Sequence, residues 1–414
     1  MPKNALYAQS GGVTAVINAS AYGVIDTARN YQDKIAKVYA AKNGIIGALN
    51  EELIDISLES PEKLQQLMHT PAGAFGSCRY KIKDDSPDYV RLIEVFKAHN
   101  IGYFFYNGGG DSQDTAYKVS TLSEKYGYPV TCIGIPKTID NDLPFTDNCP
   151  GFGSVAKYVA ISTLEAAFDV KSMAASSTKV FILEVMGRHT GWIAASSSLA
   201  AKNKNDAPHI ILLPERAFAE EAFITKVKLC VEANGYCVIV VSEGIKDKSG
   251  KFLSEAGLKD AFGHSQLGGV APVIAGLIKQ KLGYKYHWAV ADYLQRSARH
   301  IASKTDLDQA FQLGKSAVEF AMQGMHAVMP IIQREQSIPY EWSIGHVALK
   351  DVANIERTLP DEYIAEDNMG VTNLCLEYLR PLIQGEAYPP YVDGIPQYVN
   401  LDLNLVAKRL APRD

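Results

Sequence analysis

The chain has 414 residues, of which 47% are hydrophobic and 21% charged, and its net charge is −5. A single core stops growing at roughly 250–300 residues, so this length predicts two packed domains. The negative charge argues against a general nucleic-acid binder. No apolar run approaches the roughly 18 residues of a membrane span, and the N-terminus lacks the apolar region of a signal peptide. Together these features favour a cytoplasmic protein with neither nucleic acid nor membrane as a partner.

Short apolar runs recur along the chain, and each is followed by Gly or turn residues and then by a helical pattern. The runs are rich in Val, Ile and Phe and do not alternate with polar residues, which is typical of strands buried in a parallel sheet. They cover residues 5–8, 102–106, 130–135, 179–185, 209–213 and 236–241. Alternating strands and helices predict an α/β, doubly wound architecture, and two such halves fit the length.

The first run is followed by Ser10-Gly11-Gly12 and by apolar residues that share one helical face from Val13 to Ala28. Glycine permits close approach of the backbone to a ligand, and a helix N-terminus offers free N–H groups to an anion. The stretch therefore predicts a phosphate cradle, with an ordinary strand-to-helix turn as the alternative. It is neither a G-x-G-x-x-G nor a Walker A motif.

The second run leads into Asn107-Gly-Gly-Gly-Asp-Ser112. Three glycines after a buried strand let the backbone press against a ligand, and Asp111 offers a hard carboxylate of the kind that holds Mg²⁺ between phosphate oxygens. The alternative is a turn whose aspartate caps a helix that begins near Asp114 or Thr115.

The third run ends in Pro136-Lys-Thr-Ile-Asp-Asn-Asp142, which carries the most chemistry of all the loops. One carboxylate can take a proton from an attacking hydroxyl, another can hold a metal or substrate, and a lysine is a compact charge for a phosphoryl group in transfer. An Asx-type turn with surface charges is the alternative. It does not explain why an apolar strand leads straight into Lys137, Thr138, Asp140 and Asp142.

Three further stretches follow later strands and helices. Met186-Gly187-Arg188 combines a glycine with a guanidinium that suits phosphate or polyol oxygens. Glu243 ends the run before Gly244 and can accept from sugar hydroxyls, although a charge at a helix start is an equal reading. The stretch Tyr293-Leu294-Gln295-Arg296 offers a second guanidinium or, alternatively, an ordinary amphipathic helix face.

The rest of the sequence carries less functional signal. Residues 323–339 predict a short strand and turn, and the proline-rich residues 387–399 predict an irregular segment that wraps the surface or another subunit. The six cysteines contain no C-x-x-C pair, and Cys132 and Cys237 lie inside apolar runs. This pattern favours buried free thiols over a metal site or a disulfide framework.

Six motifs, taken in order, resemble those of the phosphofructokinase family over roughly residues 5–300. They are SGG, GG-x-DS, PKTIDND, MGR, SEG and LQR. The resemblance implies two Rossmann-like doubly wound domains with the active site in the cleft between them. It also implies Mg²⁺-dependent phosphorylation of the C1 hydroxyl of fructose 6-phosphate, a step of glycolysis.

Two positions indicate the pyrophosphate-dependent branch of that family. The ATP-using enzymes resemble GGDGS and PGTIDND at these loops, whereas Asp111 and Lys137 stand here where they carry glycines. Asp111 would intrude on and repel the α-phosphate and nucleoside of ATP, which selects against a nucleotide. Lys137 would neutralise charge on the transferred phosphoryl group or on the leaving phosphate, which has no adenosine to anchor it.

The resemblance assigns a role to each matching residue. Asp140 is the general base and Lys137 stabilises the transition state, so these two are the catalytic residues. Gly11, Gly12, Arg79 and Asp111 bind pyrophosphate, and Asp111 also binds the metal. The residues assigned to fructose 6-phosphate are Thr138, Ile139, Asp140, Met186, Gly187, Arg188, Glu243, Tyr293, Leu294, Gln295 and Arg296.

The resemblance also divides the chain. It implies a phosphoryl-donor domain over residues 1–145, to which part of 295–345 returns, and a sugar-phosphate domain over 146–294. Residues 346–414 form an irregular and helical C-terminal extension. The family suggests a homodimer or a homotetramer.

Three residues depart from the ATP-using enzymes of the family. Gly110 replaces a metal-side aspartate, so the metal rests on Asp111 alone or with Asp142, whose role stays open between metal ligand, substrate contact and turn cap. Lys179 replaces an arginine that reaches a neighbouring subunit's sugar phosphate, and Tyr293 replaces a histidine.

Other functions remain as alternatives. They are an ATP-dependent 6-phosphofructokinase and a non-catalytic sugar-phosphate-binding protein. A dinucleotide oxidoreductase lacks support, because the sequence has no G-x-G-x-x-G with a ribose-binding acid.

Overall fold

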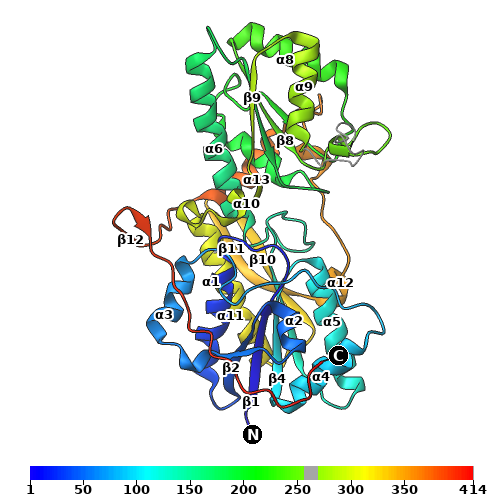
Figure 1. Cartoon of the computed structure of the whole chain (residues 1–414), viewed down its shortest axis with the longest axis vertical. Coiled ribbons are helices and arrows are strands. Elements are labelled where there is room, and N and C mark those ends of the chain that lie inside the picture. The colour runs from blue at the N-terminus through cyan, green and yellow to red at the C-terminus, as the bar shows by residue number, and fades with distance from the viewer. Residues whose placement is uncertain (256–268, 414) are drawn as a thin grey trace. The chain divides into compact units, whose positions relative to one another are not determined.

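The computed structural model describes residues 1–255 and 269–413 and divides them into two compact units, each drawn in Figure 1. Unit 1 comprises Met1–Ser154, Ser297–Glu356 and Gly385–Asp414, and unit 2 comprises Val155–Arg296 and Arg357–Gln384. The sequence predicted domain boundaries at 145/146 and 294/295. Residues 346–414, predicted as a separate extension, are shared between the two units.

Unit 1 contains a seven-stranded sheet in the order β11-β10-β5-β4-β1-β2-β3. The strands β10, β5, β4, β1 and β2 run parallel, and β11 and β3 are antiparallel at the two edges. Their bounds are β1 Lys3–Gln9, β2 Ile35–Ala41, β3 Leu53–Asp55, β4 Ile101–Gly108, β5 Thr131–Pro136, β10 Val328–Ser337 and β11 Tyr340–Ala348. The helices of unit 1 are α1 Ile17–Ala28, α2 Gly44–Leu49, α3 Pro61–Gln65, α4 Pro87–Ala98, α5 Gly110–Lys125, α11 Lys304–Met322 and α12 Leu349–Val352.

Alternation along β1 shows why both faces of this sheet are covered. Leu6 and Ala8 belong to a core that includes α4 and α5, whereas Ala5 and Tyr7 belong to a second core that includes α1 and α11. All four side chains are fully buried. A central strand with no polar face needs helices on both sides, as the non-alternating apolar run predicted.

Two predictions for unit 1 need correction. The helix expected from Val13 begins at Ile17, although Val24 and Ala28 lie on its buried face as predicted. The segment 387–399, expected to be irregular, contains the two-stranded hairpin β12 (Tyr391–Val392) and β13 (Ile395–Pro396). The tight turn at Asp393-Gly394, where both residues have positive φ, makes this hairpin.

Unit 2 contains a fully parallel sheet in the order β7-β8-β6-β9. Its strands are β6 Val180–Val185, β7 Ile210–Leu212, β8 Cys237–Ser242 and β9 Tyr286–Val290. Its helices are α6 Phe152–Met173, which begins at the end of unit 1, α7 Trp192–Ser196, α8 Glu220–Asn234, α9 Val270–Leu282, α10 Asp292–Ser297 and α13 Asn373–Leu379. One core joins the sheet to α8 and α9, and another joins it to α6.

Within the described part of the chain, no helix is long and apolar enough to cross a membrane.

A buried aspartate, Asp306, organises the start of α6. Its carboxylate accepts from the backbone N–H of Gly151 and of Ser154, each at 2.9 Å, and from the Ser154 hydroxyl at 2.5 Å. The side chain is fully buried. A carboxylate at a helix N-terminus satisfies N–H groups that have no partner within the helix, so Asp306 fixes α6 to α11.

We expect Asp306→Ala to lower the free energy of unfolding by about 3 kcal/mol, because it leaves buried N–H donors unpaired. Chemical denaturation followed by circular dichroism measures this change. Asp308→Ala on the same helix is the control, since Asp308 makes a half-exposed ion pair with Lys304 and its loss costs about 0.5 kcal/mol. Equal effects of the two substitutions would contradict this role of Asp306.

Candidate functional site

One residue connects the loops that follow three neighbouring strands of unit 1. Lys137, just after β5, is only 5% exposed, and its Nζ donates to the carbonyl oxygen of Gly12 at 2.7 Å. Its backbone N–H donates to the carbonyl oxygen of Gly108 at 3.1 Å. The loops after β1, β4 and β5 therefore meet around this lysine, at the carboxyl edge of the sheet where ligands of such sheets bind.

The backbone conformation at position 11 requires a glycine. Its φ is +76°, and a Cβ at this position would stand 3.4 Å from the Lys137 ammonium nitrogen. The Gly11 N–H donates to the carbonyl oxygen of Cys78 at 2.9 Å, and the Ser77 hydroxyl donates to the carbonyl oxygen of Gly11 at 2.8 Å. These two bonds attach the segment that carries Arg79, whose side chain is exposed, to the first glycine loop.

The anion-binding helix terminus differs from the one that the sequence predicted. Helix α1 begins at Ile17, five residues after Gly12, so its N-terminus does not adjoin the Gly11–Gly12 turn. Helix α5 begins at Gly110, and Gly109 occupies its N-cap position without a side chain. The free N–H groups of a 16-residue helix therefore follow the second loop directly, which makes the second loop the better phosphate cradle.

Asp111 lies inside helix α5, in its first turn. The alternative prediction, that Asp111 caps a helix beginning near Asp114, is therefore wrong. Its carboxylate is 71% exposed and pairs with the Lys81 ammonium group at 2.6 Å. Sequence reasoning missed Lys81, although it stands only two residues after Arg79. The pair leaves the carboxylate at the surface, within reach of a ligand.

The loop after β5 places its two carboxylates in different environments. The Asp140 N–H donates to the Thr138 hydroxyl oxygen at 3.1 Å, and the Asp140 side chain is partly exposed. Asn141 has a φ of +55° and is fully buried, and its side-chain oxygen accepts from the Cys149 N–H at 2.9 Å. A locked asparagine between them holds Asp140 and Asp142 on a fixed backbone.

Asp142 has one carboxylate oxygen inside the protein. Its Oδ1 is buried and has no hydrogen-bond partner among the described residues. Burial raises the pKa of this carboxyl, while a hydrogen bond from Thr138 and the charge of Lys137 act in the opposite direction. A buried carboxylate oxygen without a partner is the feature expected of an atom that receives a ligand.

The donor set of unit 1 fits a hard divalent cation. Among the described residues, Asp111 and Asp142 belong to no cluster of three potential metal ligands. Mg²⁺ usually binds proteins through one or two carboxylates and takes its other ligands from water and substrate phosphates. Asp111, with its exposed oxygens, and Asp142, with its unpartnered oxygen, are the carboxylates that could serve.

In unit 2, the loops after β6 and β8 pack tightly against each other. Gly187 has a φ of +126°, and a Cβ there would lie 2.5 Å from the Thr190 carbonyl oxygen. The Ser242 hydroxyl donates to the Gly187 carbonyl oxygen, and the Gly187 N–H donates to Glu243 Oε1 at 3.4 Å. The exposed Glu243 carboxylate is thus oriented by the same glycine that precedes Arg188.

Gln295 attaches α10 to this arrangement. It is 1% exposed, its Oε1 accepts from the Met186 N–H at 3.3 Å, and its amide donates to the Asp292 carbonyl oxygen at 2.9 Å. A buried Gln295 positions the loop and offers no surface to a ligand. Tyr293 and Leu294 are exposed, and the Arg296 guanidinium stacks 3.8 Å from the Tyr293 ring centre.

The Arg188 guanidinium is exposed and lies 5.4 Å from the centre of the Phe252 ring. Sequence reasoning missed Phe252, because it lies outside the motifs. A cation over an aromatic face is restrained in direction while its N–H groups stay available. Lys179, by contrast, donates to the Ala174 carbonyl oxygen of its own unit.

We expect Gly187→Ala to destabilise the protein by about 1–3 kcal/mol through its backbone alone, with a further cost from the close Thr190 oxygen. Chemical denaturation provides the test. Gly276→Ala, in the exposed face of α9 with no atom within 4 Å of the new Cβ, should instead add up to about 1 kcal/mol. A neutral Gly187→Ala would show that the loop tolerates a side chain there.

The structure therefore brings the predicted residues together in two groups. Gly11, Gly12, Asp111, Lys137 and the 138–142 loop share the carboxyl edge of the unit 1 sheet. The group in unit 2 follows β6, β8 and β9 and comprises Met186, Gly187, Arg188, Glu243, Tyr293, Leu294, Gln295 and Arg296. The catalytic and binding roles of both groups stay predictions.

Comparison with known proteins gives consistent matches. Residues 4–321 match the family described as Phosphofructokinase. The chain is 60% identical to a pyrophosphate–fructose 6-phosphate 1-phosphotransferase of Methylococcus capsulatus over 412 residues, which cover 99% of this chain and 98% of that protein. A homologue of the same description from Halomonas elongata is 61% identical over 410 residues, covering 98% of each chain.

A solved structure agrees with these matches. The crystal structure of a pyrophosphate-dependent phosphofructokinase from Marinobacter aquaeolei has a TM-score of 0.93 and 60% identity, and the match covers 100% of this chain and 99% of that one.

Proposed function

This chain belongs to the phosphofructokinase family, and we propose that it transfers a phosphoryl group reversibly from pyrophosphate to the C1 hydroxyl of fructose 6-phosphate. The products are fructose 1,6-bisphosphate and phosphate. The observation that carries the choice of donor is the buried Lys137 ammonium group, bonded to the Gly12 carbonyl oxygen where the ATP-using relatives carry a glycine. The printed descriptions of the relatives that are 60% and 61% identical support it.

Asp140 acts as the general base. It is partly exposed, and its backbone is fixed by the bond to Thr138 and by the buried Asn141. A carboxylate held in this way can accept the C1 hydroxyl proton as the oxygen attacks phosphorus. Deprotonation of the hydroxyl in the transition state makes it a better nucleophile without requiring a free alkoxide.

Lys137 stabilises the charge that moves during transfer. Phosphoryl transfer depends mainly on positioning and on electrostatic stabilisation, because the transition state spreads negative charge over the transferred group and the leaving oxygen. The bond to Gly12 fixes the ammonium group beside the glycine loop before any substrate binds. A charge placed in advance costs no reorganisation during the reaction.

Gly11, Gly12, Arg79 and Asp111 bind the donor in unit 1, and the N-terminus of α5 adds free N–H groups. In unit 2, Arg188 and Arg296 bind the sugar phosphate and Glu243 accepts from its hydroxyls. The aromatic rings of Phe252 and Tyr293 restrain the two guanidinium groups. Met186, Leu294 and the buried Gln295 shape this group, and Thr138 and Ile139 complete the contacts beside Asp140.

Magnesium is the proposed metal, since enzymes of this family generally use a divalent metal. Asp111 would hold it together with phosphate oxygens, and Asp142, with its unpartnered oxygen, is a second carboxylate for it. When bound, the metal supplies positive charge to the phosphate oxygens of the donor.

The reaction is tested by running it in both directions. Pyrophosphate and the bisphosphate are close in energy, so we expect purified protein with fructose 1,6-bisphosphate, phosphate and Mg²⁺ to form pyrophosphate. With pyrophosphate and fructose 6-phosphate it should form the 1,6-bisphosphate. Phosphorus NMR distinguishes all four species. Formation of phosphate from pyrophosphate without any sugar bisphosphate would identify a hydrolase and contradict the proposal.

We propose a homodimer or homotetramer in the cytoplasm. Several large apolar side chains of unit 2 are exposed in the single chain, and monomeric proteins rarely leave such groups uncovered in number. They include Phe168 at 67%, Met173 at 52% and Trp288 at 44% exposure. Light scattering coupled to size exclusion measures the assembly, and a mass of 45.2 kDa, that of one chain, would contradict it.

A further inference from the structure

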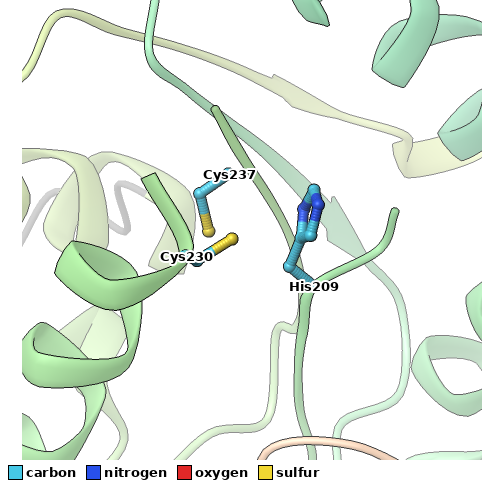
Figure 2. Close-up of side chains that lie close together, drawn as sticks. All are labelled: His209, Cys230 and Cys237. Carbon is cyan, nitrogen blue, oxygen red and sulfur yellow. The ribbon is translucent and has the colours of Figure 1, made fainter. Parts of the chain in front are cut away.

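A second cluster of reactive side chains lies in unit 2 outside the groups described above. Figure 2 shows His209, which precedes β7, beside Cys230 of α8 and Cys237, the first residue of β8. One imidazole nitrogen and the two sulfur atoms all lie within 4.8 Å of one another. Cys237 is fully buried, whereas His209 and Cys230 are partly exposed.

The hydrogen bonds of His209 decide which chemistry this cluster suits. The Val238 N–H donates to His209 Nδ1 at 3.0 Å, so the neutral ring carries its proton on Nε2. A metal ligand needs a free lone pair, and in this tautomer neither nitrogen has one. Binding a metal would require that this hydrogen bond be broken. The arrangement therefore favours chemistry of the two thiols over a metal centre.

The two cysteines are not equivalent. The Asn234 side-chain amide donates to Cys230 Sγ at 3.6 Å. A hydrogen bond from the Cys237 thiol lowers the pKa of Cys230 to about 5, and the adjacent His209 acts in the same direction. Burial raises the pKa of Cys237. The Cys230 thiol also lies 3.4 Å from the Tyr236 carbonyl oxygen, to which it donates while protonated. Cys230 is therefore the accessible sulfur of the pair, and Cys237 is the enclosed one.

We propose that Cys230 and Cys237 form a site for oxidation by hydroperoxides, with Cys230 as the attacking sulfur and Cys237 as the resolving one. The Cys230 thiolate attacks one peroxide oxygen, an S–O bond forms, and the O–O bond breaks to release hydroxide, which takes up a proton as water. The Cys237 sulfur then attacks the Cys230 sulfenic acid, the S–S bond forms, the S–O bond breaks, and a second water leaves. Two thiols are oxidised as one hydrogen peroxide is reduced.

Proximity makes the second step intramolecular. The sulfur atoms already lie within 4.8 Å and must close to about 2.05 Å. Cys237 is fully buried, so peroxide reaches Cys230 first and Cys237 reacts with the Cys230 sulfenic acid. Three other cysteines are fully buried: Cys132 and Cys149, which belong to a core of unit 1, and Cys375 of α13.

The pH dependence of the reaction distinguishes this site from ordinary thiols. Only thiolates attack peroxide, so below its usual pKa of about 8.5 a free cysteine reacts about tenfold faster for each pH unit. Because its pKa is lowered, Cys230 should instead show a rate that rises less steeply with pH over the same range. The groups that face the pair are His209 before β7, Tyr236 before β8 and Lys226 on α8.

The experiment treats the full-length enzyme with one equivalent of hydrogen peroxide, alkylates the remaining thiols and maps the peptides by mass spectrometry. We expect a Cys230–Cys237 disulfide, with Cys375, whose burial raises its pKa to about 12, still reduced. Cys237→Ser should accumulate Cys230 sulfenic acid that a dicarbonyl reagent traps, and Cys375→Ser is the matched control that should still form the disulfide.

Three results would overturn the proposal. One is a reduced Cys230 while other cysteines are oxidised. Another is a rate at Cys230 that rises about tenfold per pH unit. The third is one tightly bound zinc ion per chain that protects both thiols, since this would make the cluster a metal centre.

Discussion

Asp140→Asn should reduce kcat with pyrophosphate by about 10²–10⁴-fold, which is the range that a positioned general base contributes. The amide has nearly the same size and can still accept from its neighbours, so the loop fixed by Asn141 should keep its shape. The substrate constants should change little, because the substitution removes proton transfer and not binding. Steady-state kinetics at saturating fructose 6-phosphate measure this directly.

Asp84→Asn is the matched control for Asp140→Asn. Asp84 is an exposed carboxylate that pairs with Lys118, and it lies outside the loops of the site. We expect normal kcat for this variant and unchanged thermal unfolding for both. A kcat for Asp140→Asn within a few-fold of the wild-type value would exclude Asp140 as the base.

Lys137→Met should lower kcat with pyrophosphate by about 10²–10³-fold, the loss seen when one preorganised group that stabilises the transition state is removed. Methionine fills the buried volume of the lysine stem but provides neither the charge nor the bond to the Gly12 carbonyl oxygen. Chemical denaturation checks that the fold survives. Lys125→Met, at the end of α5, is the control for loss of a lysine away from the site.

A second form of this prediction addresses donor choice. Replacing both Lys137 and Asp111 with glycine installs the glycines of the ATP-using branch at these two positions, so turnover with ATP should rise relative to turnover with pyrophosphate. Replacing Asp111 also removes the carboxylate that pairs with Lys81, so the positive charge of Lys81 becomes available to the nucleotide phosphates. If the ratio of the two turnovers stays the same, these residues do not set the donor.

The sequence predicted those parts of the fold that depend on local hydrophobic pattern. All six apolar runs contain strands, from β1 at Lys3–Gln9 to β8 at Cys237–Ser242. Strand β9 was missed because an edge strand is half exposed, so Tyr286–Val290 lacks a continuous apolar run. Strand β2 was missed because the exposed Lys37 interrupts its apolar pattern.

The candidate site was predictable in its residues and not in their contacts. The motifs located Lys137, Asp140 and the glycine loops, because these residue types are tied to strand ends. They did not reveal that the lysine donates to the Gly12 carbonyl oxygen, since that bond joins loops 125 residues apart. Nor did they reveal the Lys81–Asp111 ion pair or the ring under Arg188, which depend on tertiary packing.

The choice of phosphoryl donor is the central claim, and one comparison tests it. Purified wild-type protein with fructose 6-phosphate and Mg²⁺ should form fructose 1,6-bisphosphate with pyrophosphate at a kcat/KM at least about 10³-fold above that with ATP, because the buried ammonium group of Lys137 and the carboxylate of Asp111 both act on the donor. Rapid formation of the bisphosphate with ATP and none with pyrophosphate would contradict the account.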